Sequence, residues 1–543
     1  MPVTSSRGTL MPNPAVARRR NGVSLIVAAL SLTFIIPVVG LMIDVGILYS
    51  VAARLQAAVD GSALAAARAL NLGLTTAAQA TSAQQNAVDW FYANFPASTW
   101  GTTNTQMSAA SVTVFDDPNN AHVRNVTVTA STNVPGYFMN WFSAKPTLLS
   151  TTGNASRRDV VVMMVLDRSG SMQTAGACAT MVTAAKLFTG QFAAGRDQIG
   201  LVSFSDNVYI HSAPTTSFQT VLGYQNDSGS GTGALDTIAC EGGTSTAQAL
   251  SVAYNELYLT NLPGALNVVM LETDGLPNTL TLNFWDSVKN VSALTSTSKC
   301  TDKNAKKLSQ GGFATASVLP SWTPGQSLAA GSYFANIPAG MVGGVYSDPP
   351  NTGNQFLVML KYWAPGTAND FSSTSYLTSS TAPGCAFDNG VWYNPPPTDI
   401  AWFPVTDVWG NSLNPSYGYL PVTLTGSHLV SNNWQTLLNA AFNATDNAAY
   451  RARTNATIPA YFFVIGLGGT DVNPPNYVLL QRVANDPNAD NFNTPPLYAA
   501  CASEAHCATY STQPQGTFIF SSSPSALGQA FLSISSQVLR LSK

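Results

Sequence analysis

Three side chains that could bind a cation follow the apolar run at residues 160–166. Asp167, Ser169 and Ser171 occupy alternate positions there, with Gly170 between the two serines. A continuous apolar run is typical of a central parallel strand that is buried on both faces. Ligands bind at the carboxyl ends of strands in such a sheet, and glycine permits the sharp turn needed there. One carboxylate and two hydroxyls in this spacing can point at a single ion.

Two further stretches can supply ligands to the same point. Thr244 lies at the expected start of a helix, and Asp274 follows a second buried strand expected at residues 267–272. Carboxylates and hydroxyls are hard oxygen ligands, which suit Mg²⁺, with Mn²⁺ or Ca²⁺ as alternatives. The competing interpretation is that these side chains only cap helices. We expect the metal ligands to be Asp167, Ser169, Ser171, Thr244 and Asp274.

These elements resemble the metal-ion-dependent adhesion site (MIDAS) of von Willebrand factor type A (VWFA) domains. The D-x-S-x-S element begins at Asp167, the threonine is Thr244, and the T-D-G element contains Asp274. The resemblance covers residues 159–275 and resumes at 432–543. It implies a bound Mg²⁺ with an open coordination position, which a carboxylate of a protein partner fills. Because two carboxylates balance the charge of Mg²⁺ but leave it short of oxygen ligands, an Asp or Glu of a partner is a favourable addition.

Alternating strands and helices after residue 158 predict a doubly wound α/β fold with a mostly parallel, Rossmann-like sheet. This is also the fold that the VWFA resemblance implies. We expect strands at 160–166, 198–205, 208–212, 267–272, 460–467 and 517–520, and helices at 180–192, 245–258, 434–453, 477–483 and 524–541.

Residues 276–430 interrupt this alternation and are rich in Pro, Gly, Asn and Ser. A loop of this length is uncommon inside a compact domain, so we interpret it as an inserted subdomain with short strands, one of them at 355–360. Since it begins directly after Asp274, it leaves from the expected metal-binding face. It is either a lid or specificity surface around the site, or a tolerated surface insertion.

An uncharged apolar segment at residues 23–43 is long enough, as a helix, to cross the roughly 30 Å hydrocarbon core of a membrane. Arginines precede it and no acidic residue does, which puts the N-terminus in the cytoplasm and the rest in the periplasm or outside the cell. The alternatives are a cleaved secretory signal, whose apolar stretch is usually only about 7–15 residues, and a prepilin-type leader cut after Gly22. Prepilin leaders usually have Glu where Val27 stands. We therefore expect an uncleaved single-pass anchor in the bacterial cytoplasmic (inner) membrane.

The anchor and the alanine-rich stretch after it resemble the N-terminal segment of TadE/TadG-like proteins of bacterial Flp (Tad) pilus assembly systems. That segment has a G-L-A-I-D-x-G-x-L-Y element followed by a stretch close to L-Q-x-A-A-D-A-A-A-L-A-A-A. The matching residues are Gly40, Asp44, Gly46, Leu48, Tyr49, Leu55, Gln56, Ala57, Ala58, Asp60 and residues 63–67.

The rest of the N-terminal region predicts a helical stalk to residue 70 and a small α+β module. We expect a helix at 76–95, strands at 111–115, 123–134 and 148–156, and a short helix or turn at 137–142 that packs against the sheet. This module is either a spacer or a docking site for pilus or envelope proteins. The expected divisions are a cytoplasmic N-terminus (1–21), the anchor (22–48), the stalk and module (49–157), and the VWFA domain (158–543) with its insert (276–430).

The six cysteines all lie beyond the anchor, and none forms a C-x-x-C pair, which argues against zinc or thioredoxin-like chemistry. An even number outside the membrane favours disulfides, although sequence alone leaves the connectivity open. Cys178 and Cys240 could brace the metal-binding face. Cys300–Cys385 could staple the insert, and Cys501–Cys507 could close a small loop.

Composition narrows the function further. Only 9% of the 543 residues are charged and the formal net charge is −3, so no positive field attracts nucleic acid. The four histidines are scattered and no hydrolase or nucleotide-binding motif occurs, so we expect no enzymatic activity; a metallohydrolase is the remote rival. We expect a membrane-anchored, Mg²⁺-dependent protein-binding protein of the adhesion type in Flp pilus assembly or surface attachment. The alternative is a structural envelope protein whose metal only stabilises the fold.

Overall fold

In the computed structural model, the chain forms two compact units. The first comprises Met1–Ala65, Gln84–Thr113 and Thr127–Asn154, and the second Ala66–Ala83, Val114–Val126 and Ala155–Lys543. The described residues are 21–142, 145–205, 208–223, 233–282, 420–425, 428–430, 434–468, 475–489 and 507–542, with short stretches between 285 and 413.

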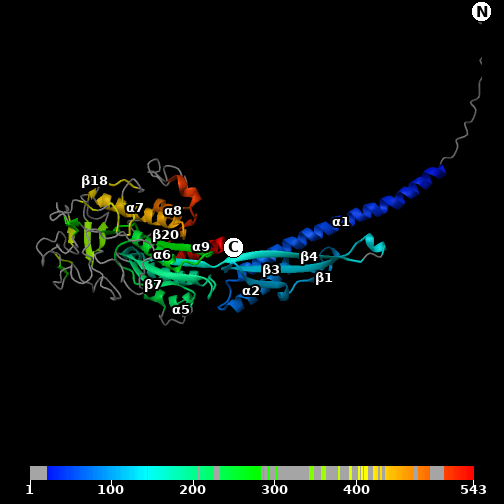
Figure 1. Ribbon diagram of the computed structural model, residues 1–543, viewed down its shortest axis with the longest axis horizontal. Coiled ribbons are helices and arrows are strands. Elements are labelled where there is room, and N and C mark those ends of the chain that lie inside the picture. Colours follow the sequence, from blue (N-terminus) through cyan, green and yellow to red (C-terminus); the bar gives the residue numbers. More distant parts are fainter. Residues whose placement is uncertain are drawn as a thin grey trace, which may run out of the picture. The chain divides into compact units, whose positions relative to one another are not determined.

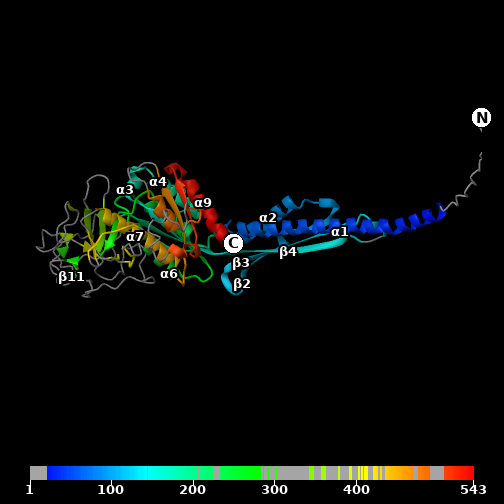
Figure 2. The same cartoon turned by 90° about the horizontal axis from the view of Figure 1, so that it is seen from above.

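One long helix, α1 (Asn21–Ala69), organises the first unit. It continues through Pro37 and runs beside the strands β3 and β4 (Figures 1 and 2). The sheet has the order β1-β3-β2, with β4 also paired with β3. The other elements that contribute to this region are α2 (Thr76–Asn94), β1 (Thr103–Gln106), β2 (Val112–Asp117), β3 (Asn120–Val134), β4 (Thr147–Arg158) and the 3₁₀ helices Thr99–Gly101, Ala109–Ser111 and Met139–Phe142.

The two halves of α1 differ in burial. Its most apolar 18-residue window has a mean hydropathy of 2.6, and 6% of that window is buried. A core helix of a soluble domain would be mostly buried, so this exposure fits a helix that faces lipid, although a signal sequence has the same character. Further along, Val51, Leu55 and Ala58 are buried at the three- and four-residue spacing of one helix face. The predicted continuous helix from anchor to stalk is confirmed.

A six-stranded sheet forms the centre of the second unit, in the order β21-β20-β8-β5-β6-β7. All neighbouring pairs are parallel except β6 and β7, which are antiparallel. The strands are β5 (Val160–Asp167), β6 (Gln198–Phe204), β7 (Val208–Thr215), β8 (Leu266–Thr273), β20 (Tyr461–Leu467) and β21 (Thr517–Ser521). The predicted mostly parallel sheet is confirmed, with an antiparallel strand at one edge.

Helices cover both faces of this sheet (Figure 2). One face carries α6 (Thr246–Thr260), α7 (Trp434–Arg453) and α8 (Tyr477–Ala484). The other face carries α3 (Gly170–Thr174), α4 (Cys178–Thr189), α5 (Phe218–Leu222) and α9 (Leu527–Leu541). The described part of this unit also contains 3₁₀ helices at Ala234–Thr237, Cys507–Thr512 and Pro524–Ala526.

Strand β5 explains the apolar run that marks it in the sequence. Val161, Met163 and Val165 pack into the core under α6 and α7, while the alternate residues pack into the core under α4 and α9. A strand that is covered on both faces has no solvent-facing position, so every residue from 160 to 166 is apolar. The sheet is therefore doubly wound, as the sequence predicts.

The predicted insert contains several small sheets. An antiparallel sheet has the order β16-β14-β13-β9, and its strand β14 matches the one expected at 355–360. The strands are β9 (Thr279–Leu282), β10 (Trp285–Asp286), β11 (Val291–Ser292), β12 (Thr301–Asp302), β13 (Val342–Ser347), β14 (Phe356–Lys361), β15 (Leu377–Thr378), β16 (Val391–Tyr393), β17 (Trp402–Phe403), β18 (Leu424–Thr425) and β19 (His428–Val430).

A later part of the insert, around Trp409 and Asn411, is built into the domain core. Trp409 is fully buried in the cluster that includes α6 and α7. Its carbonyl oxygen accepts a hydrogen bond from Arg451 of α7 at 2.8 Å, and the Asn411 amide donates to Ser251 of α6 at 2.9 Å. Residues 405–407 and 409–413 therefore belong structurally to the core of the α/β sheet and its helices, although they lie within the insert by sequence.

Candidate metal centre

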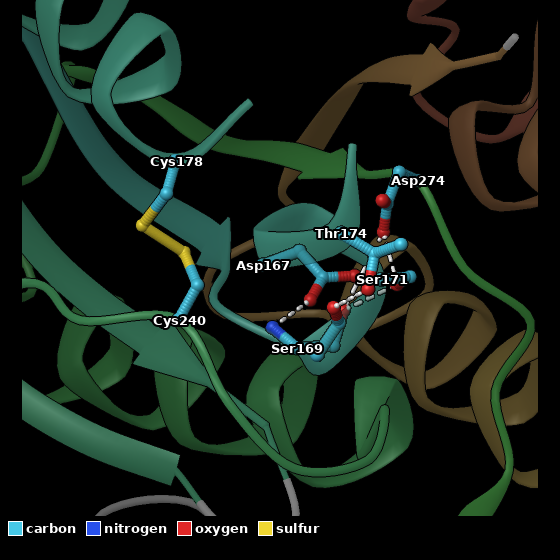
Figure 3. The surroundings of a disulfide bond; sticks show 8 residues. Asp167, Ser169, Ser171, Thr174, Cys178, Cys240 and Asp274 are labelled. Atoms are coloured by element: carbon cyan, nitrogen blue, oxygen red, sulfur yellow. Dashed lines mark hydrogen bonds between the residues drawn. A yellow bond between two sulfur atoms is a disulfide. The ribbon is translucent and has the colours of Figure 1, made fainter. Parts of the chain in front are cut away.

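The predicted ligands come together at one edge of the central sheet. Asp167 is the last residue of β5, and Asp274 directly follows β8, which is the parallel neighbour of β5. Thr244 lies two residues before the start of α6. Parallel strands bring their carboxyl ends to the same edge, so residues far apart in the sequence converge there (Figure 3).

Three of the predicted ligands contact one another directly. The Ser171 hydroxyl donates to Asp274 Oδ1 at 2.6 Å, and the Ser169 and Ser171 hydroxyls lie 2.8 Å apart. Ser169 Oγ is 3.4 Å from the same Asp274 oxygen. Neighbouring ligands of an octahedral Mg²⁺, with bonds of about 2.1 Å, are about 3 Å apart. The spacing of these oxygens is therefore compatible with adjacent positions around one ion.

Thr244 approaches the same point from the loop that precedes α6. A Cβ built on Gly275 would lie 3.0 Å from Thr244 Oγ1 and 3.5 Å from Ser171 Oγ, so both hydroxyls face this glycine. The backbone N–H of Thr244 donates to Asn278 Oδ1 at 2.8 Å, and the N–H of Asn278 donates to the Thr244 carbonyl at 3.0 Å. The threonine loop is thus tied to the chain that follows Asp274.

Asp167 is held in a fixed orientation and is 0% exposed. One carboxylate oxygen accepts from the Ser169 backbone N–H at 2.8 Å, and the other accepts from the Thr273 hydroxyl at 2.5 Å. Burial raises the pKa of the Asp167 carboxyl to about 6, although hydrogen bonds from Ser169 and Thr273 favour the ionised form. A buried carboxylate is costly unless a positive charge compensates it, and a divalent cation would do so.

Glu272 is a third buried carboxyl beside the centre, and sequence reasoning did not single it out. Among the described residues neither of its carboxylate oxygens has a hydrogen-bond partner. Burial raises the pKa of Glu272 well above its ordinary value, and the negative charges of Asp167 and Asp274 raise it further. The neutral form is therefore favoured. The signal in the sequence is an acidic residue directly after the apolar run at residues 268–271 of β8.

The donor chemistry fits a hard cation. The set consists of two carboxylates and three hydroxyls, all of them oxygen donors of the kind that Mg²⁺ prefers. Within the described part of the chain, no group of three or more His, Cys, Asp or Glu side chains is placed to hold a metal ion, so a site of the zinc type finds no support there. The five predicted residues are brought together, and their role as metal ligands stays a prediction.

A disulfide and two backbone hydrogen bonds connect the first and second of the three loops. Cys178, the first residue of α4, is joined to Cys240 (Figure 3). The N–H of Gly170 donates to the Gly242 carbonyl at 2.8 Å, and the N–H of Glu241 donates to the Arg168 carbonyl at 2.6 Å. The suggested pairs Cys300–Cys385 and Cys501–Cys507 lie outside the residues whose side chains the structure describes.

Family profiles match two parts of the sequence. The profile of the von Willebrand factor type A domain matches residues 162–276, and the profile described as "Putative Flp pilus-assembly TadE/G-like" matches residues 22–69. The first match contains all five predicted metal ligands, and the second contains the apolar half of α1. No curated protein matches the chain.

Solved structures with some similarity include three pilus proteins. The pilus adhesin SpaC of Lactobacillus rhamnosus GG has 13% identity and a TM-score of 0.32; the match covers 80% of this chain but only 36% of SpaC. The PilB minor pilin of Streptococcus sanguinis has 12% identity and a TM-score of 0.29, covering 81% of this chain and 79% of PilB. The vWF domain of the type V pili tip protein Mfa5 of Porphyromonas gingivalis has 17% identity and a TM-score of 0.31; the match covers 72% of this chain and 98% of the Mfa5 domain. The two profile matches assign a TadE/G-like segment to residues 22–69 and a von Willebrand factor type A domain to residues 162–276.

Proposed function

We propose that this chain is a membrane-anchored protein that uses a Mg²⁺ ion in its VWFA domain to bind a protein partner during Flp pilus assembly or surface attachment. The observation that supports this most strongly is the convergence of the Ser169, Ser171 and Asp274 oxygens within 2.6–3.4 Å of one another. Together with Thr244, oxygens from three separate loops meet there, which helix capping alone does not require.

Each predicted ligand has a distinct task in this proposal. Asp167 and Asp274 would balance the charge of the ion, while Ser169, Ser171 and Thr244 would add neutral oxygens. The bound ion would then attract a further carboxylate, because Mg²⁺ takes about six oxygen ligands and a partner's carboxylate can replace water at an open position. An Asp or Glu of the partner is the natural donor. Binding of this kind needs no chemical turnover, so the proposal is for a non-enzymatic protein.

The cellular setting follows from α1. Its exposed apolar half and the TadE/G-like match support an anchor in the bacterial cytoplasmic membrane. The arginines before it support a cytoplasmic N-terminus and a periplasmic or extracellular VWFA domain. Pilus or envelope proteins are the expected partners.

The point at which the insert begins supports a role for the insert in selecting the protein partner. Its first residues are bonded to the Thr244 loop, since Asn278 exchanges hydrogen bonds with the Thr244 backbone and the Thr279 N–H donates to the Thr244 carbonyl at 3.3 Å. The chain of the insert therefore leaves directly beside the candidate metal centre. We propose that it forms a specificity surface there.

Capture of partners from bacterial membranes by the full chain tests this function. We expect proteins that bind in Mg²⁺, are released by EDTA, and are lost with Asp274→Asn. Asp236→Asn is the matched control, because Asp236 pairs with Lys186 at 2.7 Å and not with the centre. Partners that stay bound in EDTA and with Asp274→Asn would refute metal-dependent binding. If Mg²⁺ then still raised the melting temperature, the structural role would be favoured instead.

A further inference from the structure

The aspartate of the TadE/G-like segment holds a distant turn against α1. Asp44 lies on α1, and one of its carboxylate oxygens accepts from the backbone N–H of Tyr137 at 2.9 Å. The other accepts from the N–H groups of Phe138 at 3.1 Å and Met139 at 2.9 Å. The turn that we expected to pack against the sheet is thus bonded to the helix.

Glycine allows this turn to come close to α1. A Cβ built on Gly40 would lie 2.6 Å from the ring of Phe138, a separation that real Cβ atoms do not show. Gly40 is one turn before Asp44 on the same helix, so the turn contacts α1 at both positions. Residues 136–142, which we name the aromatic turn, are therefore fixed beside the end of the apolar half of α1.

The aromatic turn remains exposed although it is docked. Tyr137 is 51% exposed and Phe138 is 36% exposed. On α1, at the same level, Met42 is 68% exposed and Val45 is 54% exposed. The turn therefore extends the apolar surface of the helix sideways, at the place where the uncharged segment ends.

We propose that the aromatic turn lies in the membrane interface, where it contacts phospholipids beside α1 on the side from which the chain emerges. This inference rests on the proposed membrane anchoring of α1. Tyrosine is enriched at the boundary between headgroups and acyl chains, because its ring is apolar and its hydroxyl is polar. An exposed phenylalanine beside it adds apolar surface that can be buried at that boundary. A carboxylate at that depth is tolerated when backbone donors satisfy it, and Asp44 has three of them.

Trp90 provides an internal comparison. It is 47% exposed, and its indole lies against Gly61, where a Cβ would come within 2.6 Å of the ring nitrogen. Gly61 is further along α1 than Asp44 by about 25 Å, at 1.5 Å per residue. An aromatic side chain at that distance lies beyond the interface, so exposure alone does not predict lipid contact there.

Photo-crosslinking of the full chain in vesicles tests this inference. The vesicles contain phosphatidylethanolamine and phosphatidylglycerol, with a diazirine on the acyl chain near the headgroup, and the labelled peptides are identified by mass spectrometry. We expect labels in residues 25–45 and in the aromatic turn, and none at Trp90. Labels in α1 without labels in the turn would overturn this inference and leave the anchor intact. Labels in neither would overturn both.

Variants separate docking of the turn from general disorder. Asp44→Ala leaves three N–H groups without their acceptor. Loss of each charge-assisted bond lowers the equilibrium constant for docking about tenfold, so loss of all three should strongly reduce labelling of the turn. Asp60→Ala is the matched control, because Asp60 is another acid on α1 that accepts from Gln56 at 2.8 Å. Tyr137→Ser combined with Phe138→Ser should reduce labelling of the turn while α1 stays labelled. Unchanged labelling of the turn in Asp44→Ala would contradict the role of Asp44.

Discussion

The Ser171 hydroxyl donates a 2.6 Å hydrogen bond to Asp274, a residue 103 positions further along the chain. Ser171 lies in α3, directly after β5, whereas Asp274 follows β8. The parallel pairing of β5 with β8 brings the two side chains to one edge of the sheet. This contact couples the loops that would share a metal ion.

Removing the Ser171 hydroxyl tests whether it is a metal ligand. We expect Ser171→Ala to weaken Mg²⁺ binding by about 10–100-fold, measured by calorimetric titration, because one oxygen donor is lost and Asp274 loses its hydrogen bond. Thr174→Ala is the control within the same short helix, since the Thr174 hydroxyl donates to the Gly170 carbonyl at 3.0 Å. Equal affinity in the wild type and Ser171→Ala would exclude the serine from the site.

The disulfide should contribute both to stability and to the metal centre. Replacing Cys178 and Cys240 together by alanine removes a crosslink between residues 62 apart, for which a loss of about 2–4 kcal/mol is typical. The two backbone bonds between the loops remain, so Mg²⁺ affinity should fall only several-fold. Chemical denaturation and titration of the double variant measure both effects. A double variant with wild-type stability and affinity would show that the crosslink is dispensable.

The stability of the VWFA domain should decrease as the pH rises from about 5 to 8. Burial raises the pKa of Glu256 in α6 from its ordinary value of 4.5 to about 7. Between these values the folded chain holds a proton that the unfolded chain has released, so the free energy of unfolding falls as pH rises through that window and levels off above pH 7. The shift corresponds to about 3–4 kcal/mol.

Glu256→Gln isolates this contribution. The variant should have a higher melting temperature than the wild type at pH 8 and nearly the same one at pH 5, because glutamine does not titrate. Glu241→Gln serves as the control, because the Glu241 side chain is exposed. Parallel pH profiles for Glu256→Gln and the wild type would contradict the raised pKa.

Deletion of the insert should alter partner selectivity without abolishing metal binding. Residues 405–413 must be retained, because Trp409 is in the core and Asn411 bonds to α6. β9 must also be retained, since the Thr279 N–H at its start bonds to the Thr244 loop. Replacing residues 287–400 with a short Gly/Ser linker should therefore leave Mg²⁺ affinity unchanged while the set of captured partners changes. An unchanged set of partners would leave the insert as a tolerated surface insertion.

Much of the fold could be predicted because burial leaves a pattern in the sequence. The run at 160–166 is apolar at every position, and the strand at 267–272 is apolar from Val268 to Leu271, which marks strands covered on both faces. α3 and α5 were not predicted, because five residues are too few to show helical periodicity. The helix expected at 180–192 begins instead at Cys178, where the disulfide attaches.

Contacts between distant residues were harder to foresee. The bonds from Tyr137, Phe138 and Met139 to Asp44 use backbone N–H groups, which every non-proline residue has, so no side-chain pattern announces them. The predicted metal residues could be named because their side chains must be oxygen donors at strand ends. The boundaries proposed for the anchor, the module and the domain stay predictions.

Diffraction from crystals of the chain grown with Mn²⁺ tests the central claim most directly, because Mn²⁺ has an anomalous signal and accepts the same oxygen ligands as Mg²⁺. We predict one anomalous peak at the edge of the sheet, bonded at about 2.0–2.3 Å to the hydroxyls of Ser169 and Ser171 and close to Asp274. Asp274→Asn should abolish that peak. Crystals of the wild-type chain with no peak among these residues at saturating Mn²⁺ would contradict the proposed metal centre.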